Sequence, residues 1–160
     1  MDKTYADTVR LLLAVAPDVF ANDIFAMKGG TAINLFVRDM PRLSVDIDVV
    51  YLPWQTPRDE ALQAINQELA AIAMRVAPLG VQTRLVRAKD LGDTKLIVEN
   101  DASQVKIEVN VVFRGSVLPV ERRALSARTS DLFGVEFELP VLAPDELYAS
   151  KLVAALDRQH

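Results

Sequence analysis

Cysteine is absent from the sequence, and histidine occurs once, as the final residue His160. The absence of cysteine excludes disulfide bonds and thiolate metal sites, and it fits a reducing compartment. One terminal histidine is too few for a histidine-based zinc site, a Ser-His-Asp triad or a Cys-His pair. Any chemistry must therefore come from carboxylates, lysine, arginine, hydroxyl groups and the backbone.

The sequence also lacks long apolar runs and an excess of basic residues. No run approaches the roughly 20 apolar residues that a membrane span needs, and the N-terminus does not have the pattern of a signal peptide. We therefore expect a cytoplasmic protein with no membrane partner. The formal charge is −4, whereas proteins that bind nucleic acid by charge alone are usually basic. Any contact with RNA or DNA is expected to be local, or to come from another chain.

The 160 residues suffice for one domain, and 51% of them are hydrophobic, an ordinary globular balance. Helical spacing of apolar side chains predicts helices, and alternation or β-branched runs predict strands. We expect helices over Thr4–Ala16, which Pro17 closes, over Thr31–Val37, from a Thr56 cap to about Val76, and from Pro144 onward. We expect strands over Ile24–Met27, Val45–Leu52, Val81–Val86, Lys95–Val98, Val105–Phe113 and Val135–Leu139. This order predicts an α/β (α+β) domain, a mixed sheet flanked by helices.

A glycine pair, in Lys28-Gly29-Gly30-Thr31, lies between a predicted strand and a predicted helix. Glycine allows the backbone to approach a ligand closely, and the first N–H groups of a helix suit a phosphate. The segment is therefore a candidate phosphate-binding turn. Taken alone, such a pair is more often a plain turn.

Two aspartates alternate in a strongly β-branched predicted strand, residues 44–50 (SVDIDVV). Alternate residues of a strand share a face, so Asp46 and Asp48 point the same way, with Cα atoms roughly 6.5 Å apart. Like charges at this separation repel each other, but Mg²⁺ binds carboxylates together with waters and phosphates. The pair therefore predicts a magnesium site. The alternative is a polar edge strand that discourages aggregation, but the apolar residues around the pair favour an interior strand.

A later alternating strand, residues 104–111 (QVKIEVNV), carries Lys106, Glu108 and Asn110 on one face and valine or isoleucine on the other. Alone, this pattern is typical of a half-exposed strand with a polar outer face. If the strand lies beside the aspartate strand, Glu108 becomes a third carboxylate. It can then bind metal or deprotonate an acceptor hydroxyl.

Together, the three segments resemble the AbiEii/AbiGii family of abortive-infection toxins, which belongs to the polymerase-beta-like nucleotidyltransferase superfamily. The resemblance rests on KGGTA at 28–32, RxSxDxD at 42–48 and KIEVN at 106–110, and it covers most of the chain from about Phe25. It implies a polymerase-beta-like nucleotidyltransferase fold. It also implies a Mg²⁺-dependent transfer of a nucleoside monophosphate from an NTP to an acceptor hydroxyl.

The resemblance implies a role for each matching residue. The catalytic residues would be Asp46, Asp48, Glu108 and Lys151, and the three carboxylates among them would hold a pair of Mg²⁺ ions. The nucleotide would be bound by Gly29, Gly30, Thr31, Arg42 and Ser44. Without the resemblance, Arg42 is equally a surface-loop arginine, and Lys151 is a solvated helix lysine.

The resemblance further implies partners: an NTP, a tRNA 3′ end as acceptor, and a cognate antitoxin encoded alongside. Arg122, Arg123 and Arg128 are candidates for a local RNA contact, and a solvated charged surface is the alternative. In the family the lysine helix continues into an Arg-Asp-x-x-Asp segment, whereas this chain ends at His160. We therefore expect a single nucleotidyltransferase domain, residues 1–160, truncated at its C-terminus.

Two other functions stay open at this point. The acceptor can be a small molecule, as in antibiotic-modifying nucleotidyltransferases. The chain can also be a non-catalytic module that binds nucleotide or a protein partner, a reading that the missing acidic segment favours.

Overall fold

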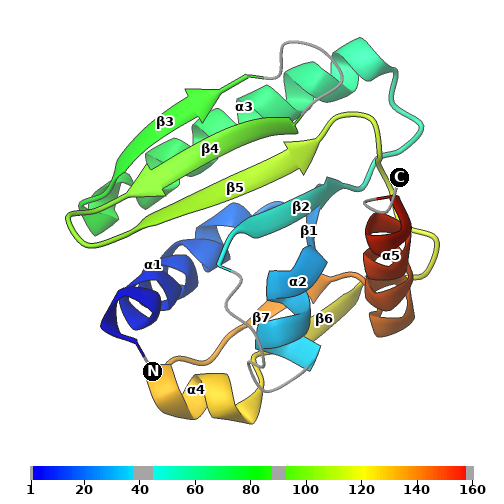
Figure 1. The fold of residues 1–160 in the computed structure, drawn as a ribbon. Coiled ribbons are helices and arrows are strands. Elements are labelled where there is room, and N and C mark those ends of the chain that lie inside the picture. The colour runs from blue at the N-terminus through cyan, green and yellow to red at the C-terminus, as the bar shows by residue number, and fades with distance from the viewer. Residues whose placement is uncertain (1, 38–44, 88–92, 158–160) are drawn as a thin grey trace.

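The computed structural model describes residues 2–37, 45–87 and 93–157. The strands are β1 Phe25–Lys28, β2 Ile47–Tyr51, β3 Gln82–Val86, β4 Asp93–Glu99, β5 Gln104–Asn110, β6 Glu121–Ala124 and β7 Glu138–Val141. The helices are α1 Lys3–Val19, α2 Gly29–Ala32, α3 Arg58–Val76, α4 Ala127–Phe133 and α5 Pro144–Asp157, with a π-helical turn η1 Ile33–Val37 and a short 3-10 helix η2 Ala77–Leu79. The strands form one seven-stranded sheet (Figure 1), which confirms the predicted mixed sheet flanked by helices.

The sheet places the aspartate strand at its centre. The strand order is β3-β4-β5-β2-β1-β7-β6, so β2 has three strands on either side of it. It pairs in parallel with β5 and antiparallel with β1. A parallel pair needs a long crossover connection, and α3, β3 and β4 lie within the one that joins β2 to β5. The prediction of an interior strand is confirmed, and the alternative of an edge strand is wrong.

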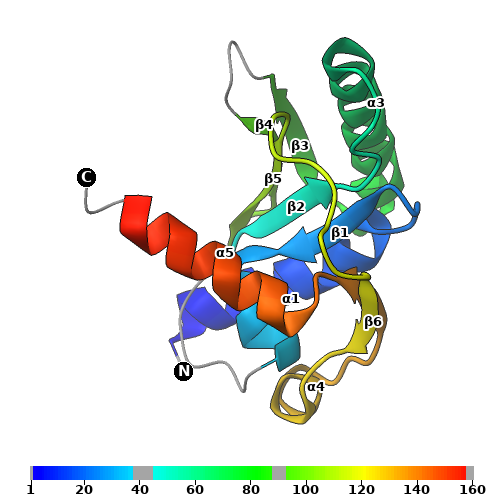
Figure 2. The ribbon, with the colours of Figure 1, turned by 90° about the vertical axis from the view of Figure 1, so that its right-hand side faces the viewer.

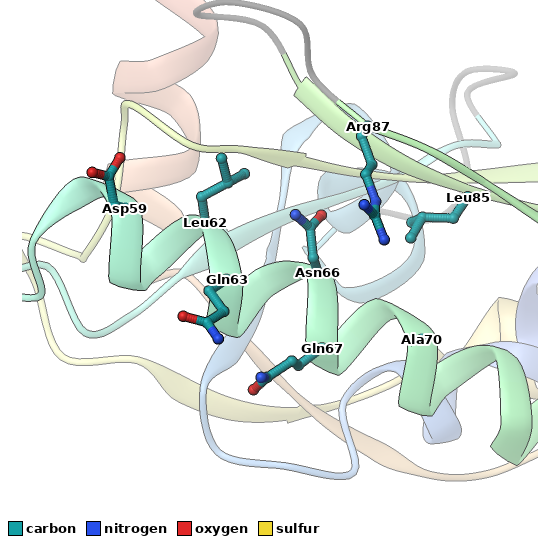
Figure 3. A pocket seen from close by; sticks show the side chains of 8 residues that line it. All are labelled: Asp59, Leu62, Gln63, Asn66, Gln67, Ala70, Leu85 and Arg87. Carbon is teal, nitrogen blue, oxygen red and sulfur yellow. The ribbon is translucent and has the colours of Figure 1, made fainter.

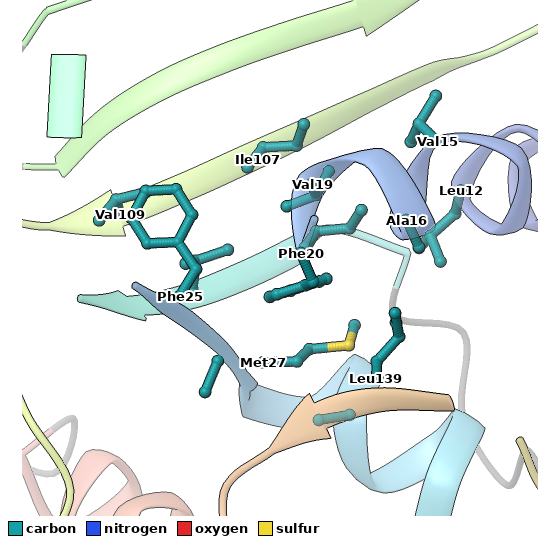
Figure 4. Close-up of a cluster of buried hydrophobic side chains, with 14 of the residues drawn as sticks. Leu12, Val15, Ala16, Val19, Phe20, Phe25, Met27, Ile107, Val109 and Leu139 are labelled. Atoms are coloured by element: carbon teal, nitrogen blue, oxygen red, sulfur yellow. The ribbon is translucent and has the colours of Figure 1, made fainter. Parts of the chain in front are cut away.

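The hydrophobic core lies between the sheet and the helices α1 and α3. Figure 4 shows side chains of α1, such as Leu12 and Val19, beside Ile107 and Val109 of β5 and Met27 of β1. These side chains are at most 2% exposed, and full burial of one such residue contributes about 1.5–3 kcal/mol. The alternating apolar residues of β5 therefore fix which of its faces turns inward. None of the helices in the described ranges has the length and hydropathy of a membrane span.

Two predicted helix boundaries are wrong. α1 continues through Pro17 and ends at Val19. Proline has a nearly helical φ and removes only one backbone hydrogen bond, while Val19 is completely buried and holds the last turn in place. α3 has Pro57, not Thr56, at its N-cap position, and no side chain caps it. Acidic residues in its first turn complement the helix dipole instead.

The chain after Ala32 also departs from the prediction. The helix expected from Thr31 begins earlier, at Gly29, and widens into the π-helical turn η1. β5 ends at Asn110, three residues before the expected end, because the Asn110 side chain accepts hydrogen bonds from the N–H groups of Val112 and Phe113. These bonds replace the strand pairing with a turn.

Two elements near the C-terminus were not predicted. β6 is rich in charge and lacks the apolar alternation that indicates a strand. α4 spans seven residues, too few for a clear helical period, although Ser126 caps it by accepting from the N–H of Thr129 at 3.3 Å. The strand expected over Val135–Leu139 forms slightly later, as β7.

Candidate active site

Four charged residues form one row across the centre of the sheet, which we call the charged row. The strand register pairs Lys28 with Asp48, Asp48 with Glu108, and Glu108 with Lys95. Residues paired in this way point to the same face of the sheet, and neighbouring strands lie about 4.8 Å apart. The fold therefore brings together two carboxylates that are far apart in the sequence.

The charged row occupies the face of the sheet that turns away from the core. Asp48 and Glu108 are half-buried, whereas the residues before and after each of them in the strand are fully buried. Asp46 is also half-buried and lies one residue before β2 begins. The alternation predicted for residues 104–111 is confirmed, and the condition for counting Glu108 with the aspartates is met, because the two strands are neighbours.

The glycine turn lies against the charged row. Gly29 has a φ of 84°, a left-handed conformation that L side chains rarely adopt. A Cβ atom added at Gly29 would lie 2.3 Å from Oδ2 of Asp48 and 3.1 Å from its Cβ. Both the backbone and the available space therefore require glycine here. The predicted phosphate turn and the predicted metal-binding aspartate therefore lie against each other.

The remaining residues of the turn present backbone atoms, rather than side chains, to a ligand. Gly30 is half-buried, whereas Thr31 is only 1% exposed. A ligand that reaches the start of α2 would meet backbone N–H groups before it met the Thr31 hydroxyl. This geometry suits an anion, because the first N–H groups of a helix have no partner within it.

Lys95 makes an ion pair that was not predicted from the sequence. Its Nζ lies 3.6 Å from Oε1 of Glu108, and the two side chains are 38% and 23% exposed. An ion pair with this exposure is worth about 0–1 kcal/mol. Glu108 can therefore exchange Lys95 for a stronger cation at little cost. Lys95 was missed because only the pairing of β4 with β5 reveals its neighbour.

The donor set agrees in type with a hard divalent cation, which prefers carboxylate oxygens. Asp46, Asp48 and Glu108 supply three carboxylates. Glycine at position 29 leaves space beside Asp48 that a side chain would occupy. Within the described ranges, no group of three or more Asp, Glu, His or Cys is already arranged to hold an ion. The residues fit the ion by their chemistry, and Glu108 would have to leave Lys95 to join the aspartates.

Lys151 lies on α5, a helix anchored beside the glycine turn. α5 contacts α2 and η1, and its one buried residue is Leu147. Beyond that residue the helix projects away from the sheet, on the side opposite α3 (Figure 2). Lys151 is exposed on this projecting part. The two other residues proposed to bind the nucleotide, Arg42 and Ser44, lie outside the described residues.

The arginines suggested as RNA contacts lie away from the charged row. Arg122 and Arg123 belong to the edge strand β6, three strands from β2. Arg122 lies 4.0 Å from a Glu138 carboxylate oxygen, and Arg123 lies 2.8 Å from one of Glu121. Arg128 is exposed on α4.

A groove of about 480 Å³ between α3 and β3 is separate from this site (Figure 3). Leu85, in its lining, is in register with Leu96 and through it with Ile107, which faces the core. The groove therefore opens on the opposite side of the sheet from Glu108. Its lining includes Asn66, whose buried Oδ1 has no hydrogen-bond partner among the described residues.

Two comparisons with known proteins give matches. The family profile described as "Nucleotidyl transferase AbiEii toxin, Type IV TA system" matches residues 10–160. Among solved structures, MenT4, a nucleotidyltransferase toxin from Mycobacterium tuberculosis H37Rv, aligns with a TM-score of 0.59 and 19% identity over 94% of this chain. The two proteins therefore share a fold, and the chain spans about half of MenT4, 54% of its length. No curated protein sequence gives a significant match.

The family match includes the glycine turn, the aspartate strand and the strand of Glu108, which the fold brings to one place. It extends over nearly the whole chain, from within α1 to the last residue. The chain belongs to the AbiEii nucleotidyltransferase toxin family.

Proposed function

We propose that the protein is a Mg²⁺-dependent nucleotidyltransferase that moves a nucleoside monophosphate from an NTP onto a tRNA 3′ end. Family membership supports the reaction class. The observation that carries the proposal is the pairing of Asp48 with Glu108 directly beside the backbone of Gly29. Carboxylates alone repel a triphosphate, so a site that combines them with a phosphate-binding turn needs a cation between the two.

In this proposal, Asp46 and Asp48 hold the Mg²⁺, and Glu108 is the third carboxylate. Mg²⁺, when bound, neutralises the phosphates and polarises the attacking oxygen. The backbone at Gly29 and Gly30, together with Thr31, holds the triphosphate. Lys151 contacts the nucleotide from α5, and its exposure leaves the side chain free to reach a ligand.

The acceptor hydroxyl oxygen forms a bond to the α-phosphorus, and the bond to the pyrophosphate leaving group breaks. In this proposal Glu108 accepts the hydroxyl proton, and its register position beside Asp48 and its weak ion pair with Lys95 support this role. Arg42 and Ser44 complete the proposed phosphate contacts from residues outside the described ranges.

The biological role that we propose is that of a toxin in the cytoplasm. Family membership in a type IV toxin–antitoxin system supports a cognate antitoxin as protein partner. Modification of the tRNA 3′ end would block aminoacylation and arrest growth, and the antitoxin would prevent this outcome.

The proposal is tested by incubating the protein with tRNA, Mg²⁺ and each radiolabelled NTP in turn, followed by denaturing electrophoresis. We expect labelled, lengthened tRNA with at least one NTP, and no labelled tRNA with Asp48→Ala or Asp46→Ala. A matched control is Asp101→Ala, because Asp101 is an exposed acidic residue in the turn between β4 and β5. If no tRNA is labelled and pyrophosphate is released only when a small hydroxylated compound is added, the acceptor is a small molecule.

The Lys95–Glu108 ion pair favours a second candidate, a module that binds nucleotide without transferring it. In that case Glu108 has a structural partner and no part in the reaction. Glu108→Gln separates the two candidates. Loss of transfer in Glu108→Gln supports catalysis, whereas NTP binding with no pyrophosphate release by the unmodified protein supports the module.

A further inference from the structure

A second cross-strand row lies next to the charged row and carries two cations. The register pairs Arg84 of β3 with Ile97 of β4, and Ile97 with Lys106 of β5. Lys106 is two residues before Glu108 on the same strand, so both side chains point to the same face, with Cα atoms about 6.6 Å apart. Arg84, two strands further, lies on this face about 10 Å from Lys106.

This face of the sheet is open. Figure 2 shows α3 on one side of β3 and β4 and no helix of the described chain over their other side. Leu85 faces α3, so the strand register puts Arg84 and Lys106 on that other side. Arg84 is exposed and Lys106 is half-buried. Ile97, which lies between them in the row, is only 8% exposed, so the accessible surface here comes mainly from the side chains on either side of it.

Arg84 and Lys106 differ from the two arginines of the edge strand β6 at the other end of the sheet. Neither Arg84 nor Lys106 has an ion pair or a side-chain hydrogen bond with any described residue, whereas Arg122 and Arg123 on the opposite edge pair with Glu138 and Glu121. Phosphate binding costs less free energy at a cation without a protein partner, because no existing ion pair has to be broken. The protein as a whole carries a formal charge of −4, so a polyanion needs a local site of this kind.

We propose that the open face of β3, β4 and β5 is the docking surface for the nucleic-acid acceptor, with Arg84 and Lys106 contacting backbone phosphates. The inference rests on the proposed function, which it deepens by placing the acceptor. A nucleic-acid strand bound by Arg84 and Lys106 continues along β5 to Glu108. The acceptor hydroxyl at the end of that nucleic-acid strand reacts there. The same contacts are independent of base sequence, since they reach only phosphates.

The test measures the affinity of the full chain for tRNA at several salt concentrations, by fluorescence anisotropy. Each phosphate contact contributes about 0.7–0.9 to the slope of log K against log salt. We expect the variant Arg84→Gln/Lys106→Gln to bind tRNA more weakly and to lower that slope by about 1.4–1.8. The matched control is Arg122→Gln/Arg123→Gln, which removes the same charge from the opposite edge and should leave the slope unchanged.

Two further measurements keep the result interpretable. Thermal unfolding of each variant shows whether the fold is intact, and Arg84→Gln alone provides a milder change with an expected slope loss of about 0.7–0.9. NTP affinity should be unchanged in Arg84→Gln, because β3 is two strands away from β5.

The docking surface is overturned if the control variant weakens tRNA binding as much as the double variant does. It is also overturned if the double variant leaves the slope of log K against log salt unchanged. If the unmodified protein lengthens tRNA in either of those cases, the proposed function stands without it. If the unmodified protein transfers a nucleotide but does not bind tRNA, the acceptor is not a nucleic acid and the docking surface is also overturned.

Discussion

Replacing Gly29 with alanine perturbs the proposed site through a single methyl group. The residue has a φ of 84°, and an L residue in the left-handed region costs about 1–2 kcal/mol. The new Cβ would also lie 2.3 Å from Oδ2 of Asp48, so the carboxylate must turn away. An off-rotamer side chain costs about 0.5–1.5 kcal/mol. Gly29→Ala should therefore destabilise the fold by about 1.5–3.5 kcal/mol.

The chain contains matched controls for the backbone part of this cost. Gly80 and Gly134 also have positive φ values, 77° and 65°, and a Cβ at either position meets no atom within 4 Å. Gly80→Ala and Gly134→Ala should each cost only the conformational part, about 1–2 kcal/mol. For a chain of this size, 1 kcal/mol shifts the Tm by about 2–4 °C, so circular dichroism resolves the difference.

The functional readout is NTP binding by calorimetry, with and without Mg²⁺. We expect Gly29→Ala to lose the Mg²⁺-dependent part of the affinity, since Asp48 no longer points to the cation, and we expect the two controls to keep it. The reasoning is refuted if Gly29→Ala unfolds at the same temperature as the controls and binds Mg²⁺ and NTP as the unmodified protein does.

Three further predictions concern stability and are measured by urea unfolding. Ile65→Ala, at a completely buried position of α3, should cost about 2–5 kcal/mol, and a loss below 1 kcal/mol would contradict the packing described for α3. Arg75→Met should cost up to about 3–5 kcal/mol, because Glu68 is 7% exposed and would lose Arg75 at 2.5 Å, keeping only its hydrogen bond from Asn22; recovery in a double variant with Glu68→Gln would confirm the pairing, and an unchanged stability would exclude it. Ser126→Ala should cost about 1 kcal/mol, since Ser126 caps α4 at the N–H of Thr129, whereas Ser126→Asp should retain the cap.

Prediction from the sequence succeeded where the signal is local and strong. The apolar period identified α1 and α3, and β-branched runs identified β2 and β5. It failed where a local rule was overridden by packing, as at Pro17, where burial of Val19 extends the helix. It also failed for β6, whose charged residues pair along an edge that no apolar pattern marks.

The candidate site was partly predictable, because part of it depends on residue spacing within a single strand. Asp46 and Asp48 are two residues apart, so strand geometry alone places them on one face. Glu108 could be included only on the condition that its strand is a neighbour, and the structure supplied that condition. Lys95 and Arg84 gave no signal of their own, because their importance comes from residues on other strands.

The sequence by itself determined the chemistry that is possible: carboxylates at alternate strand positions, a glycine pair before a helix, and no cysteine or histidine able to replace them. Those properties depend on residue type and on spacing within one element, which chain geometry fixes. Only the tertiary structure decided that β5 pairs with β2, that Gly29 presses against Asp48, and that Lys95 holds Glu108. Contacts of this kind join strands far apart in the chain, and the burial of the whole core selects them.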